Sequence, residues 1–318
     1  MSEKKATVAV QIVTYNSAKD IGSCLQSVLS QSLTVDEVIV VDNASSDETV
    51  ANLSTADTVR CIRNDRNAGF AAAHNQALAQ SASDYVVALN PDVTLHPDYL
   101  LYAIDFLVRN PQVGSVTGLL LRKQDGRTID STGLCIDRKR KAVDRCTGAI
   151  YDGDKNPVEV FGVSGAAAVY RRKMVDEVSF QGQFFDEAFF AYKEDVDTAW
   201  RAQLLGWTSY FVPMAIAYHE RGWKEGSRFE KPLFLRRHSY INRYRMMMKN
   251  ESVYYVIKHS PWILLYEAAS LGYLLLRDPK LAGAWVDLWR DRHRLLQQRK
   301  WIQERRKASW REVYGKFQ

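Results

Sequence analysis

The stretch Val8-Ala-Val-Gln-Ile-Val-Thr-Tyr-Asn16 opens with a short run rich in β-branched residues and closes on polar ones. Such a run predicts a strand that is buried on both faces of a sheet. Apolar side chains then recur at helical spacing over residues 21–29, with Asn16 or Ser17 as the expected helix cap. A second buried strand follows at Glu37-Val-Ile-Val-Val-Asp42. Strand, helix and strand in this order predict parallel pairing through a right-handed crossover.

The same alternation continues along the chain and predicts an α/β fold, with a Rossmann-like, mostly parallel sheet flanked by helices. We expect helices over 47–53, 71–80 and 194–205, and strands over 59–63, 85–89 and 207–218. The apolar pattern also returns over 160–170. Gly206 is the expected stop of the third of these helices.

Polar residues directly follow four of the expected strands. They are Tyr15-Asn16, Asp42-Asn43, Asn64 to Asn67, and Asn90-Pro-Asp92. Because ligands of open α/β sheets bind at the carboxyl ends of the strands, we expect these residues to converge on one edge. Residues 122–159 are polar and irregular, which predicts an inserted hairpin or loop over that site.

Candidate residues for nucleotide and metal binding lie at this edge. Asp42 can accept a hydrogen bond from the imide N–H of uracil or thymine, although Asp42-Asn43-Ala-Ser45 is also good turn sequence. Asp92 can coordinate Mg²⁺ or Mn²⁺, since hard cations prefer oxygen ligands, and His219 can add an imidazole, which favours Mn²⁺. A simple turn at Asn90-Pro-Asp92 and a structural histidine are the alternatives.

A candidate general base opens the expected helix over 194–205. An acidic first turn such as Glu194-Asp195 is favoured by the helix dipole whatever the function. Four phenylalanines precede it closely, and an apolar wall raises the pKa of a carboxylate toward values useful for a base. Ser164-Gly165 lets a ligand approach the backbone, and tight packing explains these residues equally well. The chain has no GxGxxG and no P-loop, so dinucleotide and ATP-type sites are disfavoured.

Together these segments resemble glycosyltransferase family 2, in particular its bacterial rhamnosyltransferase-like members. The matching segments follow the family's order over roughly residues 7–225. They are Ile12-Val-Thr-Tyr-Asn16, Val40-Val-Asp-Asn-Ala-Ser45, Asn67-Ala-Gly-Phe70 with Asn75, Leu89-Asn-Pro-Asp92, Ser164-Gly165, Lys193-Glu-Asp-Val-Asp197 with Trp200-Arg201, and His219. Each segment alone is a weak signal, and the ordered set is a strong one.

The resemblance implies a GT-A fold and an inverting, single-displacement transfer of a sugar from a nucleotide. It implies that Asp195 deprotonates the acceptor, that Asp92 binds a metal and that His219 completes the metal's shell. The family's metal motif has aspartates at both ends, but its first position here is Asn90. The implied donor contacts are Thr14, Tyr15, Asn16, Asp42, Asn43, Asn67, Gly69 and Asn90. The implied acceptor contacts are Ser164, Gly165, Glu194 and Trp200.

Relatives of this kind commonly use dTDP-L-rhamnose and build bacterial surface polysaccharides on a polyprenyl-diphosphate lipid. The resemblance therefore implies a rhamnosyltransferase that uses Mn²⁺ or Mg²⁺ and acts on a lipid-linked or oligosaccharide acceptor. A glycosyltransferase that uses a UDP-sugar is the first alternative. A catalytically idle GT-A module that binds carbohydrate is the second, and Asn90 motivates it.

The C-terminal part of the chain differs from the rest in charge. Residues 228–318 contain 20 Lys and Arg against 8 Asp and Glu, a surplus of 12, whereas the whole chain carries +6. We expect a mainly helical basic extension over 228–318 after a catalytic domain over 1–227. No nucleic-acid-binding motif accompanies this charge, so nucleic acid is not an expected partner.

An anionic lipid surface is the partner that this extension is expected to contact, and packing within a homodimer is the alternative. The expected contacts are Arg236, Arg237, Arg243, Arg245, Tyr240, Tyr244, Trp262, Trp285, Trp289 and Trp301. The apolar stretch Ser260 to Leu276 contains Glu267 and predicts a helix lying along an interface. The first residues lack the zones of a secretory signal. We therefore expect a cytoplasmic protein, peripheral at the inner face of the cell membrane.

Overall fold

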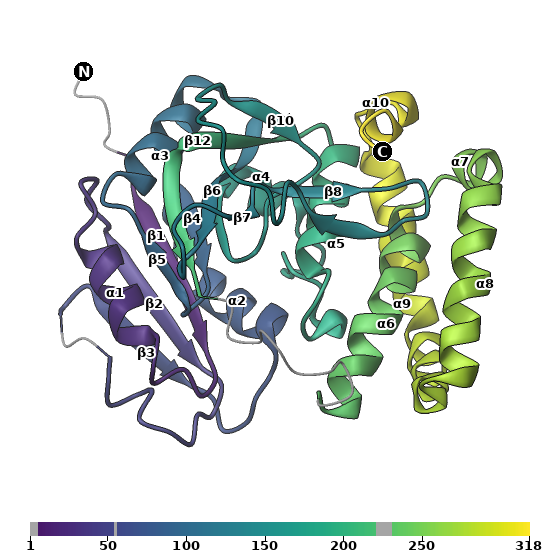
Figure 1. Ribbon diagram of the computed structural model, residues 1–318, viewed down its shortest axis with the longest axis horizontal. Helices are drawn as coiled ribbons and strands as arrows, with labels where there is room; N and C mark the ends of the chain where they lie inside the picture. Colours follow the sequence, from purple (N-terminus) through teal and green to yellow (C-terminus); the bar gives the residue numbers. More distant parts are fainter. Residues whose placement is uncertain (1–5, 54–55, 221–230) are drawn as a thin grey trace.

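The computed structural model describes residues 6–53, 56–220 and 231–318, and it has a central twisted sheet with helices on both faces (Figure 1). A group of helices from the C-terminal part stands at one end of this sheet. The expected α/β fold is confirmed. The expected boundary between residues 227 and 228 lies outside the described residues.

The sheet has the strand order β10-β12-β6-β11-β4-β1-β2-β3, and in addition β5 pairs with β12 and β7 pairs with β6. Its strands are β1 (Val8–Thr14), β2 (Glu37–Asp42), β3 (Val59–Arg63), β4 (Tyr85–Leu89), β5 (Val93–Leu95), β6 (Val113–Arg122), β7 (Ile129–Ser131), β10 (Val158–Val160), β11 (Ala167–Arg171) and β12 (Thr208–His219). Strands β4, β1, β2 and β3 are parallel, and β12 is parallel to β6. Strand β11 runs antiparallel between β4 and β6, so its first residues lie beside the carboxyl end of β4.

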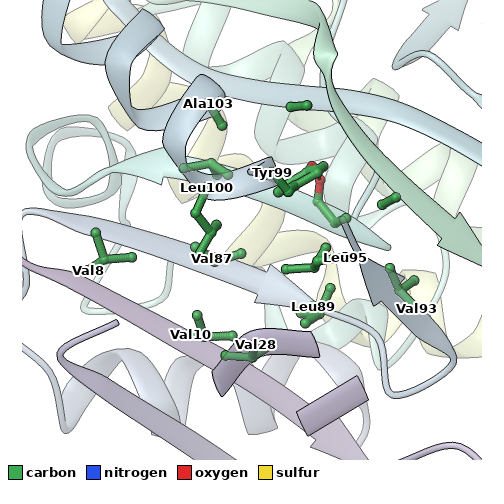
Figure 2. Close-up of a cluster of buried hydrophobic side chains, with 14 of the residues drawn as sticks. Val8, Val10, Val28, Val87, Leu89, Val93, Leu95, Tyr99, Leu100 and Ala103 are labelled. Atoms are coloured by element: carbon green, nitrogen blue, oxygen red, sulfur yellow. The ribbon is translucent and has the colours of Figure 1, made fainter. Parts of the chain in front are cut away.

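The two faces of the sheet are covered by different helices. Alternate residues of β1 and β4 face α1 (Ile21–Leu29) and α3 (Tyr99–Arg109), where Figure 2 shows buried Val10, Val87 and Leu100 packed together. The other face packs against α2 (Phe70–Ala79), α4 (Arg172–Val178) and α5 (Glu194–Leu204). Successive side chains of a strand point to opposite faces of the sheet, so a strand buried on both sides packs against helices on each face.

Two local predictions near the N-terminus are wrong. Residues 47–53 form turns instead of a helix, because the Asp47 side chain accepts hydrogen bonds from the backbone N–H groups of Thr49 and Ala18. Helix α1 begins after Asp20 without a side-chain cap, and the carboxamide oxygen of Asn16 accepts from Ser46 N–H at 2.9 Å instead.

The C-terminal part is helical, as expected. It contains α6 (Leu233–Asn250), α7 (Val253–Lys258), α8 (Ser260–Leu276), the 3₁₀ turn η3 (Pro279–Gly283), α9 (Ala284–Arg305) and α10 (Trp310–Tyr314). Helix α6 packs along α9 and against α5, and α10 returns to α5, where Tyr314 and Phe317 join the core around Trp200. Among the described helices, none is long and apolar enough to cross a membrane.

Three of the arginines that were expected to face a lipid surface are turned inward instead. Arg236, Arg243 and Arg245 are paired with Asp278, Glu267 and Asp291, and each of the three arginine side chains is at most 11% exposed. These cations tie α6 to the segment after α8, to α8 itself and to α9. The expectation that they contact lipid is therefore wrong.

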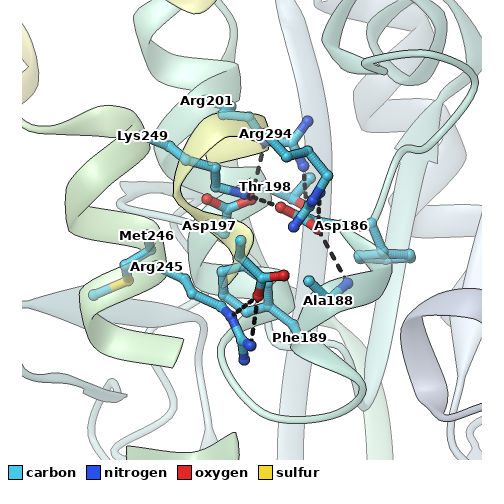
Figure 3. Close-up of polar contacts among 12 residues, drawn as sticks. Asp186, Ala188, Phe189, Asp197, Thr198, Arg201, Arg245, Met246, Lys249 and Arg294 are labelled. Atoms are coloured by element: carbon cyan, nitrogen blue, oxygen red, sulfur yellow. Dashed lines mark hydrogen bonds and ion pairs between the residues drawn. The ribbon is translucent and has the colours of Figure 1, made fainter. Parts of the chain in front are cut away.

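A buried group of charges joins the sheet-covering helix α5 to α6 (Figure 3). The ammonium of Lys249 lies 2.7 Å from carboxylate oxygens of both Asp186 and Asp197, and all three side chains are almost fully buried. Arg201 also pairs with Asp197, at 3.0 Å, and Arg294 pairs with Asp186, at 2.7 Å. Desolvated charges are tolerated only when they are paired in this way.

We predict that Lys249→Ala lowers the free energy of unfolding by about 3–5 kcal/mol, because it leaves two buried aspartates short of a cation. Chemical denaturation of the purified variants measures this change. Lys300→Ala is the matched control, since its partner Glu304 is 3.9 Å away and both side chains are exposed. It is expected to change stability by less than about 1 kcal/mol. A Lys249→Ala variant as stable as the Lys300→Ala variant would contradict the prediction.

Candidate functional site

Polar residues from distant parts of the chain meet at the carboxyl edge of β1, β2 and β4. Thr14 pairs in register with Asp42, and Asn90 follows β4. The backbone N–H of Asn90 donates to the carbonyl oxygen of Ala166 at 2.9 Å, which fixes Ser164 and Gly165 beside it. The sheet itself therefore brings the residues after β4 and before β11 together.

A cavity of about 910 Å³ opens beside this edge. Its roof includes the hairpin of β8 (Leu134–Ile136) and β9 (Ala142–Asp144), which confirms the expected hairpin in residues 122–159. The cavity is lined by Phe70, Asn90, Arg122, Asp130, Leu134, Ala142, Val143, Asp144, Ser164, Gly165, Ala166, Ala191, Tyr192, Lys193, Glu194, Asp195, Val196, His219, Lys231 and Ser239. The predicted residues Asn90, Ser164, Gly165, Glu194, Asp195 and His219 are among them.

The hairpin roof is fastened to the C-terminal helices through Arg140, which lies in the turn between its strands and is fully buried. Its guanidinium Nε lies 2.6 Å from Glu251, and Nη1 lies 3.0 Å from the His259 ring. The same guanidinium lies over the rings of Tyr314 and Phe317. The roof is thus held by groups from the segments that flank α7 and from the end of the chain.

Asp195 stands in the first turn of α5 with its carboxylate toward the cavity. Its Oδ2 accepts from Gly165 N–H at 3.2 Å, and its Oδ1 accepts from Val196 N–H at 2.8 Å. Burial raises the pKa of Asp195 above its ordinary value, while these backbone donors hold the rise back. The pKa of Glu194 rises further, first by burial and then by the charge of Asp195. Within the described residues, Glu194 Oε2 has no hydrogen-bond partner.

The segment before Asp195 has an unusual backbone and is held by one side chain from α6. Phe190, Tyr192 and Lys193 have φ values of 60°, 75° and 67°, in the left-handed region that such residues rarely adopt. The Asn242 amide nitrogen lies 2.9, 3.0 and 2.8 Å from the carbonyl oxygens of Phe189, Ala191 and Tyr192. Asn242 thereby positions the entry to α5, and no signal in the sequence pointed to it.

His219 lies between two carboxylates, at the end of β12. Its Nδ1 is 2.7 Å from Asp130 Oδ2, and its Nε2 is 3.2 Å from Asp92 Oδ1. Burial acts to lower the pKa of His219, but hydrogen bonds to Asp130 and Asp92 and their charges outweigh it and raise the pKa to about 9. Asp130 lies beside His219 but was missed in the sequence analysis, because it belongs to the polar, irregular segment 122–159, in which no single residue stood out.

These residues suit a divalent cation. A hydrogen bond from Nδ1–H to a carboxylate is the usual support for a histidine that binds metal through Nε2, and Asp92 adds an oxygen ligand on that side. The described residues contain no group of three or more histidine, cysteine or acidic side chains arranged for a metal. At this place the described residues thus offer one imidazole and one carboxylate, and Asn90 stands where the family's metal motif has a second aspartate.

The residues expected to bind the nucleotide lie at the same edge but do not line the cavity, except for Asn90. The Asp42 carboxylate is buried and accepts from the hydroxyls of Thr14 at 2.8 Å and Ser45 at 2.6 Å. The Asn43 amide donates to the Gly69 carbonyl oxygen, and the Gly69 N–H donates to the Asn67 side chain. The first of these bonds joins the loops after β2 and β3. The ring of Tyr15 is half-exposed beside them.

The expected role of Trp200 in acceptor binding is wrong. Its side chain is fully buried and packs edge-on against Phe161, Tyr314 and Phe317. It is a core residue of α5 that faces away from the cavity.

Comparison with known proteins gives a consistent result. Residues 9–179 match the model of the family described as Glycosyl transferase family 2. A relative from Mycobacterium tuberculosis (strain CDC 1551 / Oshkosh) is named N-acetylglucosaminyl-diphospho-decaprenol L-rhamnosyltransferase. It is 27% identical over 241 residues, which are 68% of this chain and 77% of the relative.

Two solved structures share the fold. GalNAc-T7 with UDP, GalNAc and Mn²⁺ has a TM-score of 0.59 and 14% identity, over 77% of this chain and 48% of that one. The chain therefore spans about half of the GalNAc-T7 structure. The mannosyltransferase PcManGT from Pyrobaculum calidifontis, in complex with GDP-Man and Mn²⁺, has a TM-score of 0.57 and 19% identity, over 94% and 85% of the two chains. The expected GT-A fold is confirmed.

We predict that Mn²⁺ raises the midpoint of thermal unfolding of the wild type, because a cation that binds only the folded state stabilises it. His219→Ala and Asp92→Asn are expected to remove most of this shift, and Asp130→Asn to weaken Mn²⁺ binding about 10- to 100-fold. A thermal titration with Mn²⁺ measures both effects. His96→Ala, a histidine beside Asp98 in an exposed pair, is the control. Equal shifts in all of these variants would exclude the site.

Proposed function

The chain belongs to glycosyl transferase family 2, and we propose that it transfers a sugar from a nucleotide donor to an acceptor hydroxyl with inversion, using Asp195 as the base. The observation that carries this proposal is the geometry of Asp195. Its carboxylate is held by Gly165 and Val196 N–H groups, faces the cavity and has a raised pKa. A base is most effective when its pKa lies near the working pH.

In the proposed reaction, Asp195 takes the proton of the acceptor hydroxyl as that oxygen bonds to the anomeric carbon of the donor sugar. The bond from the anomeric carbon to the diphosphate oxygen breaks on the opposite face, which inverts the configuration. Asp92 and His219 would hold a divalent cation, Mn²⁺ or Mg²⁺, whose charge stabilises the departing diphosphate. Asp130 would keep the His219 ring in the orientation and tautomer that this requires.

The proposed donor is dTDP-L-rhamnose, and the proposed acceptor is a lipid-linked or oligosaccharide hydroxyl in bacterial surface-polysaccharide synthesis. The printed name of the M. tuberculosis relative supports the sugar and the lipid-linked acceptor, since it names an L-rhamnosyltransferase and N-acetylglucosaminyl-diphospho-decaprenol. Asp42 would hold the imide of the base, with Thr14 and Ser45 fixing its carboxylate. Tyr15, Asn16, Asn43, Asn67, Gly69 and Asn90 would surround the donor, and Ser164, Gly165 and Glu194 the acceptor.

We also propose a division of the chain into a catalytic domain over 1–227 and a basic helical extension over 228–318, working at the inner face of the cell membrane. The lipid carrier in the relative's name supports that location. A homodimer formed through the extension is the alternative arrangement.

Two alternatives have support of their own. A UDP-sugar donor is consistent with the same imide contact, because uracil and thymine share that N–H. An idle carbohydrate-binding module is favoured by Asn90, which leaves the metal with one carboxylate. Screening dTDP- and UDP-sugars with Mn²⁺ for slow hydrolysis separates these outcomes, because hydrolysis identifies the donor without an acceptor. If no sugar nucleotide is hydrolysed and no nucleotide stabilises the protein, the idle module is favoured.

We predict that Asp195→Asn lowers the rate of sugar transfer about 10²- to 10⁴-fold, the usual contribution of a general base. Donor affinity, measured by calorimetry with the nucleotide and Mn²⁺, is expected to stay unchanged, because the amide keeps the size of the carboxylate. Asp105→Asn, which removes an exposed carboxylate of α3, is the control for transfer rate. Normal transfer by Asp195→Asn would show that another group is the base.

The pH profile provides a second prediction. Burial raises the pKa of Asp195 to about 6 from its ordinary 3.8, and only the deprotonated form accepts a proton. We therefore expect kcat/KM to fall as the pH drops through about 6. The charge of Asp144 contributes to this raised pKa, so Asp144→Asn should move the acidic limb to lower pH. An acidic limb near pH 4 in the wild type would contradict the assignment.

A further inference from the structure

Helix α8 turns its acidic residue toward the protein and exposes apolar residues to solvent. Glu267 faces α6, where it accepts hydrogen bonds from Arg243 and from the Tyr244 hydroxyl. Of the α8 side chains, only Ile263 and Leu274 are fully buried. Every fully exposed position of α8 carries an apolar residue. An ordinary surface helix has the opposite arrangement.

The exposed side of α8 forms one continuous apolar face. Leu264, Leu271 and Leu275 are 66%, 54% and 62% exposed and follow one another at helical spacing, so they lie in one row. Trp262 and Leu276 stand near its two ends, at 46% and 84% exposure. Isolated exposed leucines are common, but a full helix side of them marks a surface that binds something apolar.

The charges around this face have one sign. Lys258, Arg277 and Lys280 flank the two ends of α8 and are exposed. The acidic residues of the same region, Glu267 and Asp278, are engaged by Arg243 and Arg236 on the protein side. An apolar strip bordered by exposed cations is the arrangement that binds at the surface of an anionic bilayer.

We propose that the apolar face of α8 docks on a bilayer that contains anionic lipid, with the helix lying in the plane of the interface. Its leucines enter the acyl region while Lys258, Arg277 and Lys280 contact the headgroups. A second copy of the chain is a poorer occupant, because the same cations would then meet across the contact and repel each other.

This docking deepens the proposed function, on which it rests for its link to a lipid-borne acceptor. Asp278, directly after the last turn of α8, is paired with Arg236 of α6. Ser239, less than one helical turn further along α6, lines the cavity. One end of the docked helix is therefore tied to α6, the same helix that contributes Ser239 to the cavity wall. A sugar acceptor on a lipid would reach the cavity from that surface.

The test is co-sedimentation of the full chain with vesicles of phosphatidylcholine, alone or mixed with phosphatidylglycerol. The wild type is expected to bind the mixed vesicles, with binding weakened by salt. The triple variant Leu264→Glu, Leu271→Glu and Leu275→Glu should bind about tenfold less or weaker still, because it places charges in the acyl region. The matched control is Leu101→Glu with Val108→Glu, which alters exposed apolar residues of α3 and should bind like the wild type.

Circular dichroism establishes that each variant is folded, and serine at the same three leucines is the milder replacement if glutamate prevents folding. Failure of the wild type to bind mixed vesicles would overturn the proposal. So would a wild-type dimer that the triple variant converts to a monomer without any vesicle binding, because the face would then join two copies.

The outcome is separable from that of the proposed reaction. Vesicle binding is measured without donor, and donor hydrolysis is measured without vesicles. Asp195→Asn should bind mixed vesicles as the wild type does, and the triple leucine variant should hydrolyse donor at the wild-type rate. If the protein binds vesicles but hydrolyses no nucleotide-sugar, the docking surface is supported and the proposed enzymatic function is contradicted.

Discussion

The ammonium of Lys249, buried between Asp186 and Asp197, is the interaction on which the arrangement of the site depends. A charge in this position cannot leave its partners without a large desolvation cost, so α6 is held against α5 and the segment before it. Because α6 is fixed there, Asn242 reaches the carbonyl groups that precede Asp195. The helical C-terminal part is thus a component of the site and not only an attachment to it.

Much of the fold could be predicted from the sequence, because local pattern and tertiary environment agree there. The runs at 8–14 and 37–42 are β-branched and end on polar residues, and they form adjacent parallel strands. The turn over 47–53 was mistaken for a helix because periodicity does not reveal that the Asp47 side chain competes for backbone N–H groups. Residues 99–122, which form α3 and β6 at the centre of the fold, were not assigned.

The position of a site residue could be predicted where it directly follows a strand of the sheet. It could not be predicted where the residue lies in a long connection between strands or in a packed helix. Asn90 and His219 directly follow expected strands, and they meet Gly165 and Asp195, whose roles the family resemblance implied, at one cavity. Asp130 and Asn242 were missed because each arrives from a segment whose path is set by packing. Trp200 was placed wrongly, since its position in a matching motif says nothing about which side of α5 it occupies.

The buried Arg140 has a mechanical consequence for the cavity. Its guanidinium joins the β8–β9 roof to Glu251, which directly follows α6, and to His259, which directly precedes α8. A roof anchored in this way cannot move as an independent lid, because moving it alone would separate the buried cation of Arg140 from the carboxylate of Glu251. Opening the cavity on this side requires the outer helices to shift together with it, so forces acting on those helices are transmitted to the entrance.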